Sequence, residues 1–172
     1  MVRIQKQYVF EGPGGRADLR ELFESRRRLI VYHFPFDPAW DEGCGRSSHL
    51  ADHVAGGIVH LPARDTSFAA VSRAPIAKIE SCKKRLGWTF PWLSSRDNDF
   101  NDDFRVTLEE ADSAETNAEL PGLSVFLRDG TEVFHAYSTY QRGVDALLGT
   151  YDSLDVTPLR RHDRFPPQQA RR

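Results

Sequence analysis

The sequence predicts an α/β fold in which helices cover both faces of a central mixed sheet of four to five strands. Apolar or β-rich runs alternate with segments of helical periodicity, in the order strand, helix, strand, helix, hairpin, helix. Two strand–helix–strand steps place parallel strands side by side, whereas a hairpin adds antiparallel strands. A chain of 172 residues can bury one core, so we expect a single domain over residues 1–157.

The first half of the chain contains two apolar runs that fit central strands. Residues 29–34 read Leu-Ile-Val-Tyr-His-Phe, and residues 67–72 read Ser-Phe-Ala-Ala-Val-Ser. Runs of this kind are typical of strands that are covered on both faces. A short strand and turn over residues 7–15 precede them, and an extended piece over residues 90–93 follows.

Two helices are expected next to these strands. Leu50 and Val54 lie at helical spacing, which predicts a helix over residues 44–56. Pro75 suits the first position of a second helix, and Gly87 suits its end. The apolar stripe of the second helix consists of Ile76, Ile79, Cys82 and Leu86.

The last third of the chain contains the clearest local signal, a β-hairpin. Residues 122–127 and 131–137 are rich in β-formers and flank Asp129-Gly130, a strong turn signal. Apolar residues over 144–151 then predict an amphipathic helix.

Two segments fall outside this pattern. Residues 107–119 carry five carboxylates and no Lys or Arg, which predicts a solvated acidic insertion. Residues 158–172 are rich in Arg and Pro, which predicts a disordered basic tail.

Composition narrows the classes of function. The net charge of −2 gives no electrostatic basis for binding nucleic acid or an anionic membrane. No apolar stretch approaches the roughly 20 residues of a transmembrane helix. Residues 1–10 lack the apolar core of a secretory signal, so we expect a cytoplasmic protein. Its two cysteines cannot form a disulfide framework.

The main candidate for chemistry is Cys44, which follows a strand and a loop and starts a helix. Unpaired N–H groups and the dipole at a helix N-terminus favour a thiolate. Arg46 favours the thiolate too, whereas Asp41 and Glu42 oppose it. The residue three positions on is Ser47, whose hydroxyl can hydrogen-bond a thiolate but cannot resolve a mixed disulfide. An inactive remnant that only fills the helix start is the alternative.

The second cysteine and the histidines have simpler interpretations. Cys82 shares the apolar stripe, so a buried role is favoured over a disulfide to Cys44, which needs Cα atoms within about 7 Å. His49 and His53 lie four apart on one helix face and are zinc-ligand types, but no second ligand pair supports a site. We therefore predict no metal and no other cofactor. His33, within an apolar strand, is expected to be a hydrogen-bonded core residue.

Aromatic side chains are dense in the middle of the chain, and most are expected in the core. Trp40, close to Cys44 in sequence, is a candidate to line a binding cleft. Arg142 follows the hairpin and is a candidate to reach the same end of the sheet and pair with an anion or the thiolate.

The order of elements resembles the thioredoxin fold, with a cysteine at the first strand-to-helix turn and Pro121 before the hairpin. This resemblance implies that Pro121 is cis, faces Cys44 and helps to bind an extended partner. A closer resemblance, over residues 7–158, is to the bacterial family catalogued as domain of unknown function 899, a predicted dithiol-disulfide oxidoreductase. The stretches that carry it are Tyr8-Val9-Phe10-Glu11-Gly12-Pro13, Trp40-Asp41-Glu42-Gly43-Cys44, Val71-Ser72-Arg73-Ala74-Pro75 and Gly87-Trp88-Thr89-Phe90-Pro91-Trp92.

The chain departs from that family at one position that matters for chemistry. The family typically carries Cys-x-x-Cys, whereas this chain has Cys44-Gly45-Arg46-Ser47. The first hypothesis is therefore single-cysteine thiol–disulfide exchange through Cys44, with the thiol or disulfide of a protein or small molecule as partner. The alternatives are a non-catalytic module that binds a peptide or protein and, less favoured, a thiol peroxidase. A homodimer is left open.

Overall fold

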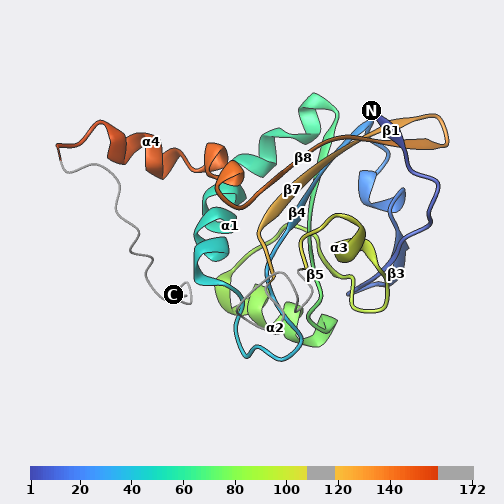
Figure 1. The fold of residues 1–172 in the computed structure, drawn as a ribbon, viewed down its shortest axis with the longest axis horizontal. Helices are drawn as coiled ribbons and strands as arrows, with labels where there is room; N and C mark the ends of the chain where they lie inside the picture. The colour runs from blue at the N-terminus through green and yellow to red at the C-terminus, as the bar shows by residue number, and fades with distance from the viewer. Residues whose placement is uncertain (108–118, 159–172) are drawn as a thin grey trace.

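The computed structural model describes residues 1–107 and 119–158 (Figure 1). The strands are β1 Val2–Arg3, β2 Val9–Gly12, β3 Gly15–Asp18, β4 Arg28–His33, β5 Thr66–Ser72, β6 Trp92–Ser94, β7 Gly122–Asp129 and β8 Glu132–Tyr140. The α-helices are α1 Gly45–Gly57, α2 Ile76–Leu86, α3 Phe100–Asp103 and α4 Gly149–Asp155. Short 3₁₀ helices are η1 Glu21–Phe23, η2 Ile58–His60, η3 Pro62–Arg64 and η4 Gln141–Leu147. The predicted tail beyond residue 158 and most of the predicted acidic insertion lie outside the described residues.

All eight strands form one mixed sheet in the order β1-β8-β7-β4-β5-β6-β2-β3. β4, β5 and β6 are parallel, and the β7–β8 hairpin joins β4 in antiparallel pairing. The central five strands, β8 to β6, match the predicted sheet, but the predicted total of four to five strands is wrong. The extra strands come from β1, which pairs with β8, and from the β2–β3 hairpin, which pairs with β6 through Glu11 and Ser94.

The two faces of the sheet are covered by different elements, as Figure 1 shows for α1 and α3. Alternation along β4 sends Tyr32 to the face that α1 and α2 cover, and Leu29 and Val31 to the face that α3 and η1 cover. Helices thus lie on both faces, as predicted. α4 projects from the body of the molecule at the far end of the described chain (Figure 1).

The aromatic residues of the middle of the chain are mostly buried, as expected. On the α1 and α2 face, Trp88 and Trp92 pack around Phe34, with ring centroids 5.7 and 4.6 Å from it. On the other face, Phe100 and Phe104 pack with centroids 4.6 Å apart. These rings fill both layers of the core and hold the carboxyl ends of the central strands, where β4 leads into the loop before α1.

Within the described residues, none of the helices has the length and apolar character needed to cross a membrane.

The predicted core role of His33 is confirmed. Its Nε2 lies 2.8 Å from Ser124 Oγ, which lies 2.8 Å from Ser138 Oγ. The ring stacks on Phe100 at a centroid distance of 5.3 Å. Burial and, to a smaller extent, His135 lower the pKa of His33 to about 3. The imidazole is therefore neutral in the native state at neutral pH.

This buried histidine makes stability depend on pH. Between its unfolded pKa of about 6.5 and its native pKa of about 3, the unfolded state binds more protons. The free energy of unfolding should therefore fall as pH drops below 6.5, with His33 contributing up to about 1.4 kcal/mol per pH unit. His33→Gln should flatten this slope in urea unfolding at pH 7, 6 and 5. The matched control is His60→Gln at an exposed histidine; equal slopes in wild type and His33→Gln would contradict the assignment.

Candidate thiol site at Cys44

Cys44 lies where the sequence predicts, at the start of α1. It is the N-cap residue, and its half-buried side chain makes no capping hydrogen bond. Its backbone N–H donates to the Pro35 carbonyl at 3.1 Å. Its carbonyl accepts from the N–H of Ser48 at 2.9 Å and from the Ser48 hydroxyl at 3.0 Å. The backbone of Cys44 is thus fixed on both sides, while its sulfur stays available at the positive end of a 13-residue helix.

One face of α2 holds the loop that leads to Cys44. Lys78 Nζ donates to the carbonyls of Pro38 and Trp40, both at 2.9 Å. One turn on, the thiol of Cys82 accepts from the N–H of Gly43. These contacts come from positions i and i+4 of α2, so a single helix face fastens the loop over its length.

A pair of buried hydroxyls lies on the sheet side of the thiol. Tyr32 is 1% exposed, and its hydroxyl faces Ser47, which is also 1% exposed. Both oxygens are among the buried polar atoms of the described residues that lack a well-aligned hydrogen-bond partner. Burial raises the pKa of Tyr32, and the charge of a Cys44 thiolate acts in the same direction, whereas Ser47 opposes the rise. Tyr32 therefore stays neutral, with its hydroxyl next to Ser47 in the first turn of α1.

Sequence reasoning missed Tyr32. The run 29–34 is apolar throughout its length, so its pattern did not show which side chains share the face of the cysteine helix. The alternation of side chains along a strand could have identified it, because every second residue of β4 points to the same face. Ile30 and Tyr32 therefore both point to the face that α1 covers.

Arg46 forms an ion pair that spans two elements. Its Nη2 lies 3.1 and 3.2 Å from the carboxylate oxygens of Asp145 in η4. The pair is partly buried, with Asp145 13% exposed, so solvent screens it incompletely. It links the first turn of α1 to the segment after the hairpin. Because Asp145 partly neutralises the Arg46 guanidinium, it weakens the electrostatic effect of Arg46 on Cys44.

The other predicted binding residues are more dispersed. Trp40 is half-buried, packs against the core on the α1 face and belongs to the loop before Cys44. Arg142 is exposed in η4. Pro121 is half-buried and its carbonyl accepts from Gln141 N–H at 2.8 Å. It precedes Gly122, which pairs with His33, the last residue of β4. Pro121 therefore lies at the carboxyl end of β4.

The predicted cis bond at Pro121 is wrong, because none of the peptide bonds in the described ranges is cis. Pairing of Gly122 with both His33 and Tyr140 already fixes the chain at this point with a trans peptide.

The prediction that Cys82 is buried is confirmed, since it is 5% exposed and packs with Ile79 and Leu86. The sequence did not predict the contact of Cys82 with Gly43, the residue before Cys44. A cavity of about 130 Å³ opens beside it, lined by Asp41, Glu42, Lys78, Ser81, Cys82 and Arg85.

His49 and His53 contact the start of α4. His49 Nε2 lies 3.3 Å from the Thr150 hydroxyl, and His53 Nε2 accepts from Gly149 N–H at 3.0 Å. In the part of the chain that the structure describes, no group of three or more His, Cys, Asp or Glu side chains could hold a metal ion.

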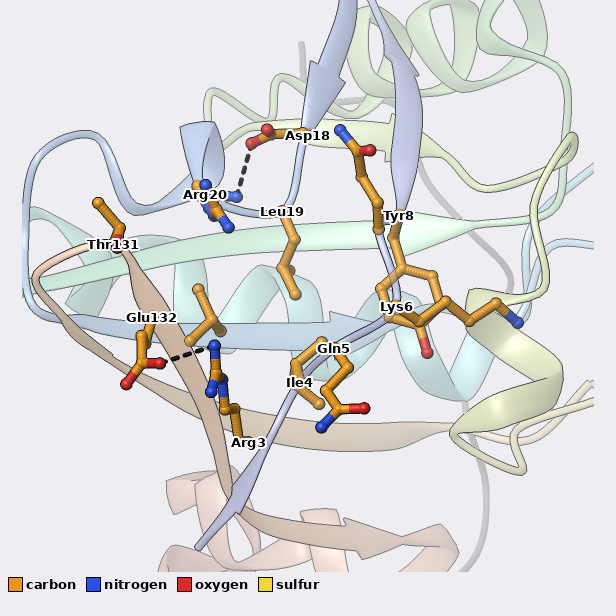
Figure 2. A pocket seen from close by; sticks show the side chains of 12 residues that line it. Arg3, Ile4, Gln5, Lys6, Tyr8, Asp18, Leu19, Arg20, Thr131 and Glu132 are labelled. Carbon is orange, nitrogen blue, oxygen red and sulfur yellow. Dashed lines mark hydrogen bonds and ion pairs between the residues drawn. The ribbon is translucent and has the colours of Figure 1, made fainter.

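A separate cavity of about 370 Å³ lies between the N-terminal segment and the β7–β8 turn (Figure 2). Its lining comes from residues 3–8, 18–20 and 131–133, and Arg3 is paired there with Glu132 at 2.7 Å. None of the candidate site residues lines this cavity.

The profile of a family described as bacterial protein of unknown function (DUF899) matches residues 1–172. The chain belongs to this family. A comparison of the DUF899 chain with curated proteins gives no match.

Several solved structures are similar to this DUF899 protein. Peroxiredoxin Q of Xanthomonas campestris is 16% identical, with a TM-score of 0.62, over 84% of this chain and 89% of that chain. Peroxidoxin BcpB of Mycobacterium tuberculosis is 15% identical, with a TM-score of 0.57, over 87% and 94% of the two chains. At these identities the likeness establishes a thioredoxin-like α/β fold, as predicted.

The Arg46–Asp145 pair predicts how reactivity responds to charge. Arg46→Gln removes the cation nearest in sequence to Cys44, and alkylation by iodoacetamide at pH 6 should slow roughly three- to tenfold. Asp145→Asn leaves Arg46 unneutralised and should speed the same reaction. Arg16→Gln, on exposed edge strand β3, serves as the control for loss of a positive charge. If Arg46→Gln and Arg16→Gln slow the alkylation of Cys44 equally, the rate depends on net charge alone, and a local effect of Arg46 on Cys44 is ruled out.

Proposed function

We propose that this DUF899 protein carries out thiol–disulfide exchange through Cys44. The observation that carries the proposal is the position of this partly exposed thiol at the N-cap of α1. The Cys44 thiolate attacks one sulfur of a disulfide R–S–S–R, forming Cys44–S–S–R and releasing RS⁻. A helix N-terminus stabilises the attacking thiolate and the same thiolate when it leaves again.

Ser47 has a supporting role in this proposal. Its hydroxyl lies in the first turn of α1 and faces the Tyr32 hydroxyl, which makes it a donor for a thiolate at the helix start. It carries no sulfur and cannot displace R–S from Cys44. A second thiol must therefore complete the cycle.

The partner class is a thiol or disulfide of a protein or small molecule. Trp40 offers a half-buried aromatic surface in the loop before Cys44. The surface proposed to receive an extended or anionic partner also includes Pro121, at the carboxyl end of β4, and the exposed Arg142 in η4.

Thiol peroxidase activity is the second candidate, favoured by the likeness to peroxiredoxins. A structure of the Xanthomonas campestris bacterioferritin comigratory protein, 18% identical, is described in terms of alkyl peroxide reduction activity. Three residues before Cys44, however, stands exposed Asp41, which lines the cavity next to Cys82. An ionised carboxylate cannot donate a hydrogen bond to a bound peroxide, so disulfide exchange is the better supported chemistry.

The test of the proposed function is the reactivity of Cys44 at a pH where ordinary thiols are protonated. At pH 6, Cys44 in the Cys82→Ser variant should react with iodoacetamide at least about tenfold faster than a cysteine in an unstructured peptide. Denatured protein of the same variant is the matched control. Equal rates would refute an activated thiol and leave the non-catalytic binding module. Consumption of hydrogen peroxide faster than of a disulfide would favour the peroxidase.

Ser47→Cys should produce a gain of function. The side chains at the N-cap and at the third residue of α1 lie within one turn, so the variant can close a local disulfide. It should reduce insulin disulfides faster than wild type when a recycling reductant is present. Ser48→Cys, one position further along α1, is the control. An equal gain in both variants would show that the added thiol acts without the Cys-x-x-Cys geometry.

A further inference from the structure

Cys82 is an internal thiol directly beside the loop that ends in Cys44. Its sulfur accepts from the N–H of Gly43, the residue that precedes Cys44. Standard backbone dimensions place the Gly43 nitrogen about 5 Å from the Cys44 Cα. The two cysteines are therefore separated by one peptide unit and one hydrogen bond, although 37 residues lie between them in the sequence.

The surroundings of Cys82 differ from those of a cysteine that only fills a core. Its thiol contacts the Arg85 guanidinium as well as the Gly43 N–H, and both contacts favour a thiolate. Burial is the larger effect and raises the pKa of Cys82, so the thiol is protonated at rest. A positive group and an N–H donor aimed at the sulfur are the features that assist a thiol when it acts as a nucleophile.

The structure also leaves space next to the Cys82 thiol, into which the Cys44 sulfur would have to move. A cavity of about 130 Å³ opens on Cys82 between α2 and the loop, bounded by Asp41 and Glu42. Cys44 lies between Gly43 and Gly45, so the chain on both sides of it carries no side chain that resists rotation. For Cys44 to turn toward α2, its N–H must leave the Pro35 carbonyl and the first turn of α1, where its carbonyl accepts from Ser48, must open.

We propose that Cys82 is the resolving thiol of Cys44, so that the protein completes disulfide exchange with an internal Cys44–Cys82 disulfide. This inference rests on the proposed function, because it needs Cys44 to form the first mixed disulfide. It replaces the external second thiol by one that the chain itself supplies on α2.

The step balances as an ordinary exchange. Cys82–SH attacks the Cys44 sulfur of Cys44–S–S–R; the Cys82–Cys44 bond forms, the bond to R–S breaks, and the proton passes to the leaving thiolate as RSH. Over the whole sequence the two cysteines lose two electrons and two protons, and R–S–S–R gains them as two RSH. An external dithiol returns the protein to its reduced form.

The experiment uses dithiobis(nitrobenzoate), an aromatic disulfide whose released thiolate is coloured. Reduced wild-type protein should release two equivalents of the coloured thiolate, the second in a first-order phase independent of reagent concentration. The product should carry no adduct and weigh two hydrogen atoms less than the reduced chain. Peptide mapping of this product should show one peptide pair joined through Cys44 and Cys82.

Variants separate this inference from the proposed function. Cys82→Ser and Cys82→Ala should each release one equivalent and keep one adduct on Cys44, and Cys44→Ser should react only slowly at buried Cys82. Peptide mapping of the wild-type product tests the Cys44–Cys82 disulfide even if a variant fails to fold. Wild-type protein that ends with a stable adduct on Cys44 and a free Cys82 overturns the resolving role alone. Loss of fast release in the folded Cys82 variants overturns the proposed function as well.

Discussion

The contact between one face of α2 and the loop over residues 35–43 is the interaction on which the thiol site depends. A loop packed under a helix must satisfy its backbone polar groups, since burying an unpaired carbonyl is costly. Lys78 provides donors for two carbonyls of this loop, and the Cys44 N–H satisfies a third at Pro35. The same fastening sets where α1 begins, and so puts the sulfur at the positive end of the helix.

Neighbouring residues of strand β4 point to opposite faces of the sheet and have different surroundings. Tyr32 points to the α1 face and lies next to Ser47, whereas His33, one residue on, points to the opposite face and its serine network. The two groups differ because their surroundings differ. The Tyr32 hydroxyl faces Ser47 at the start of α1, whereas His33 lies in an aromatic pocket that keeps its imidazole neutral. The most strongly perturbed histidine is therefore part of the core and not of the thiol site.

Local signals account for what the sequence predicted correctly. The start of α1 at Cys44, the α2 limits at Pro75 and Gly87, and the Asp129-Gly130 hairpin each depend on residues a few positions apart. The features that were missed depend on distant pairing. β3 has the sequence Gly-Arg-Ala-Asp, with little β-propensity, and is a strand because it pairs with β2, which in turn pairs with β6. The contact of Cys82 with Gly43 likewise appears only when α2 packs on the loop.

Placing the second thiol on α2 instead of in the first turn of α1 makes the two cysteines unequal. In a Cys-x-x-Cys turn both sulfurs lie near the same helix N-terminus, so both thiols are activated by the same dipole. Here Cys44 alone has that field and partial exposure, while Cys82 is buried with its pKa raised. An incoming disulfide therefore meets Cys44 first, and Cys82 reacts only with a sulfur already carried by Cys44. The order of the two steps follows from the helix N-terminus at Cys44 and from the burial of Cys82, and Ser47 can serve as a hydrogen-bond donor.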